Sequence, residues 1–563
     1  MINQNPNLPI ANLAVGTIVE VDGSHIVAEV DPGVSDLTRT FAGETYAIGQ
    51  FGSIVRVHYG RRNLYALVGR LRMKADFEVE RGLPPTAAPD ERILEADLFG
   101  EGDWTQTDGE WSLTFERGVS AYPLPRQTVY LTPRTELKAI FRQGVEKPVI
   151  KIGEHVGGDA PCFADLNELL GKHTAVLGST GAGKSAAVAA LIRAILDRKN
   201  HGNYATWHPQ VVILDPHNEY ASAFPEGSLM SPTRGTLRLP YWLLSFQETI
   251  DLLIGKTEFV ATSQANIVKS ALLTAREEGA DAIGIDKSRI TVDSPVPYSL
   301  NRFKALVDAS RTGSPSSQSS WDSILAKLEV LQSDARMNFL TEEWAPSSRD
   351  PFPEILGALV GEAHSVRIID LSGMPNEVAG ICSAVIARSL FNLKVWQSDA
   401  DREASPVLLV CEEAHRYVPN RGEAQYEAAK DAIRRIAKEG RKYGVALMIV
   451  SQRPSEVEDT VLSQCSSWLI LRITNDADRS HVRSMLPDSV AGLVKTLSSL
   501  RRREAVFLGQ AAAMPSRILI ENLAPDQLPR SRDIDFDKGW QCAPLSLAQL
   551  SEAAEHWRYQ STS

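Results

Sequence analysis

Short runs of β-branched and apolar residues, separated by turn signals, fill the first part of the chain. The segment VGTIVEVDGSHIVAEV holds two such runs on either side of Asp22-Gly23, a dipeptide typical of a tight hairpin. The pattern returns in YAIGQFGSIVRVHYGRRNLYALVGRLRM, where glycines interrupt the strands. Many short strands at close spacing predict a small barrel, and we assign residues 1–150 to an N-terminal β-barrel domain.

From His173 onward, apolar strands alternate with Ala- and Leu-rich helices. This alternation predicts an α/β domain with a parallel sheet, which we place at residues 151–250 and 355–520.

The intervening residues 251–354 have a mostly helical pattern and are expected to form an inserted helical lobe. A Ser- and Gly-rich stretch, SRTGSPSSQSS at 310–320, interrupts this lobe and predicts a flexible segment. After Pro515 the periodicity fades into a charged tail with a short helical end, and we assign residues 521–563 to this C-terminal tail.

Composition narrows the class of protein. The 563 residues are 43% hydrophobic and 23% charged, which excludes a disordered, collagen-like or coiled-coil chain. No apolar run approaches the roughly 18 to 20 residues that span a bilayer, and the first residues lack the pattern of a signal peptide. The five scattered cysteines form no CxxC pair, so we expect reduced thiols, no membrane and a cytoplasmic location.

The net charge of −11 bears on nucleic-acid binding. A protein that coats DNA over its outer surface is usually basic. Any contact of this chain with DNA is therefore expected in a local groove or channel.

The strongest chemical signal is HTAVLGSTGAGKSAAVAALIRAILDR. An apolar strand at His173–Leu177 leads into Gly178–Ser185, which fits GxxxxGK[ST], and a helix follows at Ala186–Arg198. Inward-turned backbone N–H groups and the helix dipole suit phosphates, so we predict ATP binding. Lys184 is expected to reach the β and γ phosphates, and the Ser185 hydroxyl to ligate Mg²⁺. The residues predicted to contact the nucleotide are Gly178, Ser179, Thr180, Gly181, Ala182, Gly183, Lys184, Ser185 and Ala186.

Two adjacent carboxylates follow a second apolar strand. In VLLVCEEAHRYVP, the strand at Val407–Val410 leads to Glu412 and Glu413. At a strand end the chain can turn both side chains toward a phosphate. We predict Glu412 near the Mg²⁺ shell and Glu413 as the general base for the attacking water.

A third strand, Val445–Val450, ends at Ser451 and Gln452, and we predict that Gln452 senses the γ phosphate or the water. A helix rich in Arg and Lys precedes this strand. Multimeric P-loop motors take a cation from the neighbouring subunit, and we choose Arg441 for this role. Weaker signals after another apolar strand, Asp215, His217 and Glu219, suggest either turn residues or side chains near the nucleotide.

Taken together, these segments resemble the HerA family of the HerA/FtsK branch of P-loop motors. The segments that carry the resemblance occur in the family's order: LGSTGAGKS, ILDPHNEY, ITVDSPVPYSL, LLVCEEAHRYVP, IAKEGRKYGV and VSQRPSEV. The resemblance implies a RecA-like ATPase behind an N-terminal barrel, assembled as a homohexamer that pumps double-stranded DNA through its pore. It also implies a tail that braces the neighbouring subunit, and it leaves Arg434 and Arg435 as rivals of Arg441.

The resemblance further implies an effector partner, either a nuclease of the NurA type or a nuclease or sirtuin-like NAD-consuming enzyme, in DNA end processing or anti-phage defence. The residues do not choose between these settings. An alternative is an ATP-gated scaffold that regulates its effector without pumping DNA. A GTPase-like switch is disfavoured because the chain has no NKxD motif.

Overall fold

The computed structural model describes most of the chain, in the following residues: 6, 8–34, 37–88, 90–107, 110–142, 148–156, 160–201, 206–232, 234–254, 261–311, 315–346, 349–374, 376–420, 427–487, 490–530 and 535–559. It divides into two compact units, each built from two stretches of chain. Unit 1 comprises Met1–Gly202 and Val450–Leu523, and unit 2 comprises Asn203–Ile449 and Ala524–Ser563.

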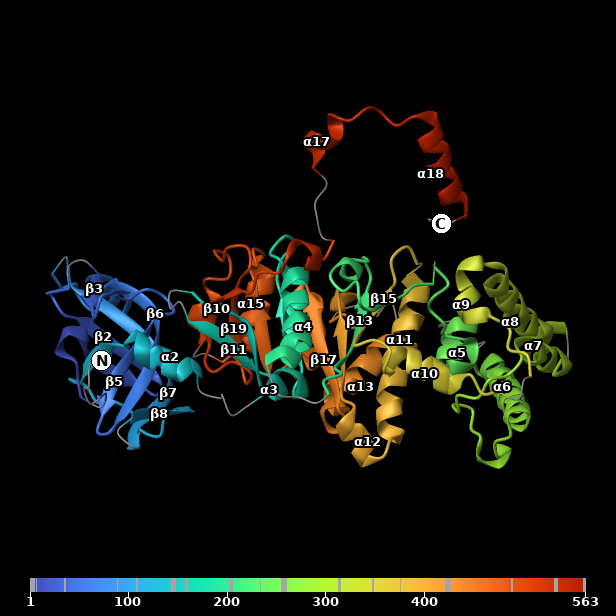
Figure 1. Cartoon of the computed structure of the whole chain (residues 1–563), viewed down its shortest axis with the longest axis horizontal. Coiled ribbons are helices and arrows are strands. Elements are labelled where there is room, and N and C mark those ends of the chain that lie inside the picture. Colours follow the sequence, from blue (N-terminus) through green and yellow to red (C-terminus); the bar gives the residue numbers. More distant parts are fainter. Residues whose placement is uncertain are drawn as a thin grey trace. The chain divides into compact units, whose positions relative to one another are not determined.

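The amino-terminal part of unit 1 is a closed barrel of six strands, in the order β1-β9-β5-β6-β7-β2, and pairing of β2 with β7 closes the ring (Figure 1). An additional strand, β8, extends from β7. The strands are β1 (Ala14–Asp22), β2 (His25–Val30), β5 (Ile54–Tyr59), β6 (Arg62–Met73), β7 (Arg92–Thr107), β8 (Glu110–Arg117) and β9 (Thr128–Leu131). The predicted barrel is confirmed, and Gly23, at φ +57°, forms the hairpin turn between β1 and β2.

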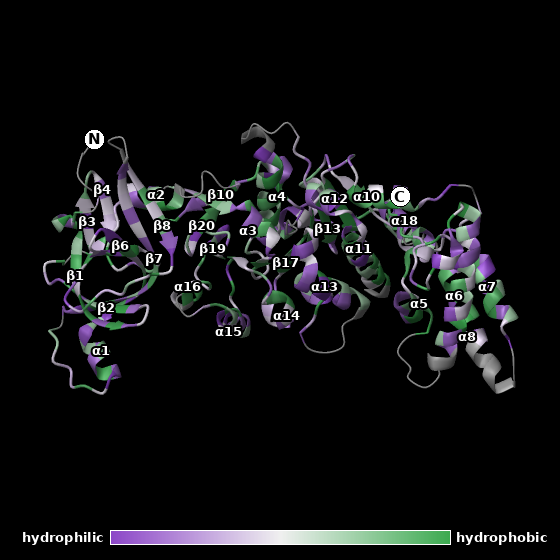
Figure 2. Cartoon of the chain, turned by 90° about the horizontal axis from the view of Figure 1, so that it is seen from below, coloured by the Kyte–Doolittle hydropathy of each residue, from purple (hydrophilic) through white to green (hydrophobic). Residues whose placement is uncertain are grey.

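Alternating side chains fill the barrel, because successive residues of a strand point to opposite faces. Hydrophobic and hydrophilic residues follow one another along the strands in Figure 2. The shorter elements here are β3 (Thr38–Phe41), β4 (Glu44–Ala47), α1 (Lys74–Glu80) and α2 (Arg134–Arg142). Glu136 of α2 is buried and accepts hydrogen bonds from Arg56, Asn63 and Tyr65 of the barrel, which fixes this helix on the barrel wall.

The rest of unit 1 contains six strands in the order β11-β10-β20-β19-β18-β12. They are β10 (Val149–His155), β11 (Pro161–Asp165), β12 (Thr174–Leu177), β18 (Ser467–Ile470), β19 (Glu504–Gly509) and β20 (Ser516–Ile520). Only the β12–β18 pair is parallel among these described strands; the other neighbours are antiparallel. The sheet strand β20 begins directly after Pro515, where the sequence pattern predicted the start of a fading tail.

The helices of this part of unit 1 are α3 (Leu166–Gly171), α4 (Lys184–His201), α14 (Asp459–Leu462), α15 (Asp476–Met485) and α16 (Ala491–Val494). Helix α4 follows β12 directly across the glycine-rich loop. The predicted strand, loop and helix are thus all present.

Unit 2 holds the parallel strands in the order β17-β16-β13-β15-β14. They are β13 (Gln210–Asp215), β14 (Ser228–Met230), β15 (Val366–Asp370), β16 (Val407–Cys411) and β17 (Val445–Ser451). The chain passes from unit 2 into unit 1 within β17, between Ile449 and Val450. Beside these strands, α11 (Asn376–Trp396) packs on α13 (Glu427–Tyr443), and α12 (Asp399–Ala404) lies between them in the chain.

The other helices of unit 2 fall mainly between β14 and β15 in the chain. They are α5 (Phe246–Leu253), α6 (Ala261–Ile283), α7 (Leu300–Ala309), α8 (Pro315–Ser333), α9 (Asn338–Thr341) and α10 (Phe352–Val360). Helices α6, α7 and α8 lie side by side (Figure 1). The stretch predicted to be flexible divides here: residues 315–320 are helical in α8, and 312–314 lie outside the described residues.

Helix α11 corrects the expectation that no apolar stretch approaches membrane-spanning length. Its residues Val378–Trp396 are long and apolar enough to cross a bilayer, the one such window in the described residues. However, 67% of that window is buried inside the protein, as in a core helix.

The last described helices are α17 (Phe536–Trp540) and α18 (Leu547–Tyr559). Their large apolar side chains are exposed, among them Trp540 and Trp557 at 82% and 79%.

Candidate nucleotide-binding site

The phosphate-binding loop lies in unit 1 between a fully buried strand, β12, and helix α4. Gly181 and Gly183 have φ values of +75° and +97°, a region that side chains other than glycine rarely adopt. A Cβ added at Gly181 would have no atom within 4 Å, so this side of the loop is open to a ligand. The backbone therefore forms the cradle that a phosphate requires.

Neighbouring strands hold the loop in place. The Gly178 N–H donates to the Ser451 carbonyl at 3.2 Å, and the Ser179 N–H donates to the Arg472 carbonyl at 2.9 Å. A Cβ at Gly178 would come within 2.9 Å of the Leu471 Cβ, so the strand end leaves no room for a side chain. The loop is therefore fixed on both sides by backbone contacts.

Gln452 lies against the loop. The Thr180 hydroxyl donates to Gln452 Oε1 at 2.5 Å. Lys184 and Ser185, at the start of α4, are 9% and 8% exposed. The structure thus brings Gln452 next to the P-loop, and its role as a γ-phosphate sensor stays a prediction.

The paired carboxylates lie in unit 2 at the end of the fully buried strand β16. Glu412 and Glu413 are 2% and 5% exposed. Glu413 has φ +52° and ψ +50°, a left-handed conformation that is strained for a residue with a side chain. Such strain in a non-glycine residue is common where a side chain must be aimed at a functional position, which fits the predicted reorientation at the strand end.

Tyr220 and His415 are among the side chains that contact this pair. The buried Tyr220 hydroxyl donates to Glu412 Oε2 at 2.6 Å, a short bond of the kind made to a charged acceptor. His415 Nδ1 lies 3.3 Å from Glu413 Oε2, an ion pair when the imidazole is protonated. Neither residue is predicted for these roles from the sequence. However, Tyr220 closes the ILDPHNEY segment and His415 follows Glu413 by two positions, so both belong to motifs that the sequence singles out.

Asp215 is fully buried at the end of β13, beside this group. Its carboxylate accepts from the His217 N–H at 3.2 Å and from the Tyr220 N–H at 2.9 Å. Burial, with a smaller contribution from the nearby Glu412 charge, raises the pKa of Asp215 to about 6 against the lowering effect of the backbone donors. Asp215 therefore shapes the turn, as one interpretation predicted, and lies near Glu412; a place near the nucleotide stays a prediction.

The three arginines considered for the neighbouring subunit differ in their surroundings on α13. Arg434 is paired with Asp431 at 3.1 Å. Arg435 lies over the Phe391 ring at 4.6 Å and near Glu439. Arg441 is exposed, and its side chain has no ion pair or hydrogen bond within the described residues. Figure 2 shows both hydrophilic and hydrophobic residues along helix α13.

The two residues predicted to hold Mg²⁺ lie in different units. The Ser185 hydroxyl of unit 1 and the Glu412 carboxylate of unit 2 are each hard oxygen ligands of the kind that Mg²⁺ prefers. No group of three His, Cys, Asp or Glu side chains that could hold a metal occurs in the part of the chain that is described. Mg²⁺ is usually bound by one or two protein oxygens together with water and substrate phosphates.

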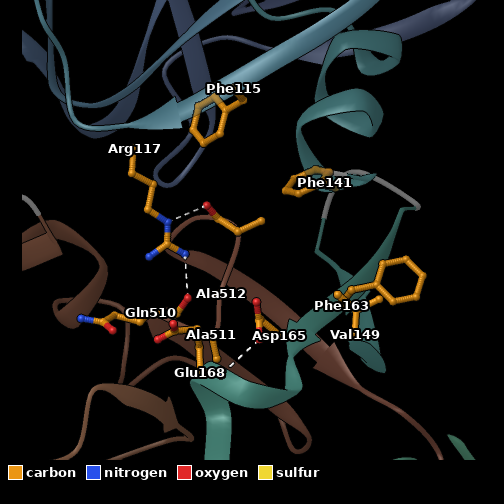
Figure 3. A pocket seen from close by; sticks show the side chains of 11 residues that line it. Phe115, Arg117, Phe141, Val149, Phe163, Asp165, Glu168, Gln510, Ala511 and Ala512 are labelled. Carbon is orange, nitrogen blue, oxygen red and sulfur yellow. Dashed lines mark hydrogen bonds between the residues drawn. The ribbon is translucent and has the colours of Figure 1, made fainter. Parts of the chain in front are cut away.

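A separate cavity of about 480 Å³ lies elsewhere in unit 1 (Figure 3). Arg117, the last residue of β8, donates from Nε to the Ala513 carbonyl at 3.1 Å and from Nη1 to the Gly509 carbonyl at 2.8 Å. The aromatic rings of Phe115, Phe141 and Phe163 also line this cavity. None of its lining residues belongs to the P-loop, so it is distinct from the nucleotide site.

A glycine-rich loop with Lys and Ser at a helix start, a Gln at its side and tandem carboxylates after a buried strand define a P-loop ATPase behind a β-barrel. The family described as "Helicase HerA, central domain" matches residues 150–390. This match and the sequence relatives below support membership of the HerA family.

Two sequence relatives support this assignment. A probable helicase of Methanocaldococcus jannaschii is 28% identical over 403 residues, which cover 71% of each chain. The DNA double-strand break repair helicase HerA of Pyrococcus furiosus is 27% identical, over 64% of this chain and 66% of its own. Among solved structures, the bacterial conjugative coupling protein TrwB matches with a TM-score of 0.45 and 14% identity, over 71% of this chain and 94% of its own.

Proposed function

We propose that this chain couples ATP hydrolysis to movement along double-stranded DNA. The observation that carries the proposal is the P-loop of unit 1, with Gln452 bonded to its Thr180. Membership of the HerA family supports DNA as the substrate, because the Pyrococcus furiosus relative is a DNA double-strand break repair helicase.

Each polar group has a part in this chemistry. Lys184 binds the β and γ phosphates, and Gln452 contacts the γ phosphate or the water. Glu413 accepts the proton of the attacking water, while His415 holds its carboxylate in place. Ser185 and Glu412 would hold Mg²⁺, which neutralises charge on the β and γ oxygens when bound.

We further propose a homohexameric ring with DNA in its central pore. Arg441 completes the site of the next subunit, as its exposure and lack of a side-chain partner in the described chain allow. The exposed tryptophans of α17 and α18 supply apolar surface for a neighbouring subunit. A pore can hold DNA through a few phosphate contacts per subunit, which reconciles the net charge of −11 with this substrate.

The partner in this proposal is an effector enzyme in the cytoplasm, either a nuclease of the NurA type or a sirtuin-like or other nuclease effector. The resemblance to the family is its support. Purification together with the product of the adjacent gene tests it, and co-elution of an enzyme with DNA-cleaving or NAD-consuming activity is the expected result.

The decisive experiment measures phosphate release by the assembled protein with and without double-stranded DNA. We expect DNA to stimulate turnover, and Lys184→Ala and Glu413→Gln to abolish it. Glu439→Gln, an exposed Glu to Gln change on α13, is the matched control and should behave as the wild type. An intact assembly whose hydrolysis ignores DNA would refute translocation. If Glu413→Gln, which binds ATP without hydrolysis, still supports the effector, the chain is an ATP-gated scaffold.

A further inference from the structure

Three consecutive arginines precede strand β19, and the structure separates their roles. Arg501 is 87% exposed and lies 3.8 Å from Glu504. Arg503 has φ +69° and donates to the Ile520 carbonyl at 2.7 Å, so its side chain fixes the turn. Arg502 is exposed, and its side chain has no ion pair or hydrogen bond among the described residues. The middle arginine is therefore the one whose charge the fold itself does not use.

The turn at residues 501–503 lies against the P-loop. The Arg503 N–H donates to the Ala182 carbonyl at 3.5 Å. A Cβ built at Gly183 would lie 3.8 Å from Arg503 N and 4.0 Å from Arg502 Cγ. The stem of Arg502 thus passes over Gly183, and its guanidinium lies only three bonds beyond that Cγ. A phosphate held by this loop is within its reach.

The position along the loop indicates which phosphate. Gln452 is bonded to Thr180, on the side of the loop that faces Ser451. Arg502 lies at Gly183, where the backbone N–H groups at the start of α4 cradle the α and β phosphates. The two polar side chains therefore lie at different positions along the phosphate-binding loop.

We propose that Arg502 binds the α phosphate of the nucleotide held by its own subunit and sets the affinity for both ATP and ADP. The inference rests on the proposed nucleotide site and adds a binding residue to it. A guanidinium that donates to a phosphate oxygen makes one of the stronger polar contacts in proteins. Because this contact exists equally before and after hydrolysis, it acts on binding and not on the chemical step.

Equilibrium binding of ATP and of ADP with Mg²⁺, in the full-length assembly without DNA, tests the proposal. Arg502→Ala should weaken both nucleotides by about tenfold, while kcat at saturating ATP stays within about twofold of the wild type. Arg502→Lys keeps the charge but loses the planar fork, so its nucleotide affinity should lie between those of the wild type and Arg502→Ala. Arg501→Ala is the matched control and should bind both nucleotides normally.

The other outcomes each overturn the assignment. Weaker binding of ATP alone would place the arginine at the γ phosphate. A lower kcat with unchanged affinity would make it a catalytic group, and unchanged values throughout would make it a solvated surface charge. Failure of this proposal can be distinguished from failure of the proposed function, because the binding assay needs neither DNA nor hydrolysis. Nucleotide binding that survives in Lys184→Ala would count against the nucleotide site itself.

Discussion

Tyr220 is a residue whose removal tests the arrangement of the carboxylates most directly. Its side chain is fully buried, and its hydroxyl donates to Glu412 Oε2 at 2.6 Å. The Tyr220→Phe change removes one oxygen and leaves the ring in place. It therefore withdraws a hydrogen bond from a buried carboxylate without opening a large cavity.

The size of the effect follows from the charge of the acceptor. A hydrogen bond to a charged group contributes about 1.5–3 kcal/mol. At about 1.4 kcal/mol for each factor of ten, this equals a 10- to 100-fold change if the bond is needed to orient Glu412 in the transition state. Glu412 makes further contacts, so we expect the lower end of this range. Stability should fall by about 1–2 kcal/mol for the same reason.

The assay is steady-state ATP hydrolysis over a series of Mg²⁺ concentrations, together with urea unfolding. We expect kcat to fall about tenfold and half-saturation to require more Mg²⁺, because Glu412 is the predicted Mg²⁺-side carboxylate. Tyr241→Phe is the control, since the buried Tyr241 hydroxyl donates to the neutral Tyr298 carbonyl in the helical part of unit 2. It should lose some stability and keep its kcat. If both variants lose the same stability and Tyr220→Phe keeps full activity, Glu412 needs no help from Tyr220 and our reasoning is wrong.

Three further changes give separate tests. Arg441→Ala should lower ATP turnover by about a thousandfold. Mixing Arg441→Ala subunits with Lys184→Ala subunits should restore part of the activity, because a boundary between the two kinds of subunit can combine an intact P-loop with an intact arginine. No recovery in mixed rings would argue for a rival arginine. The pKa of Asp215 rises on folding from 3.8 to about 6. Its contribution to the free energy of unfolding, about 3 kcal/mol, is therefore complete below pH 3.8 and is lost as the pH rises through 6. Asp215→Asn should accordingly lose less stability than the wild type in urea unfolding between pH 5 and 7.5, and parallel curves would contradict this. Arg117→Ala removes charged donors to the carbonyls of Gly509, Gln510 and Ala513 between β19 and β20, and hydrogen exchange at residues 509–513 should become about tenfold faster while β12 is unchanged.

Local patterns predicted the local elements well. The Asp22-Gly23 turn, the strand before Gly178 and the strand before Glu412 each depend on neighbouring residues, and each is present in the structure. The antiparallel strands β19 and β20 were harder to predict. They pair with each other across a short turn, but β20 also pairs with the distant β10, and the half-buried strand Ser516–Ile520 is too short to show a clear periodicity.

The site shows the same limit. The P-loop and the Glu412–Glu413 pair are contiguous motifs, so the sequence alone predicts them. The bond between Tyr220 and Glu412 joins residues 192 positions apart, and no spacing rule indicates it. The approach of Arg502 to Gly183 likewise depends on the fold, because three arginines in a row look like a solvated surface in the sequence.

The division of unit 1 into two distant stretches of chain has a consequence for how the protein is made. Strand β12, which leads into the phosphate loop, pairs with β18 about 290 positions later, and β10 pairs with β20 further still. A growing chain on the ribosome therefore synthesises the long first stretch of unit 2, Asn203–Ile449, before the sheet beside its phosphate loop can close. A fragment cut at residue 390, where the family match ends, would present β12 without β18 and expose a hydrophobic strand edge. Expression of the whole chain, and not of the matched segment, is the sound route to an active enzyme.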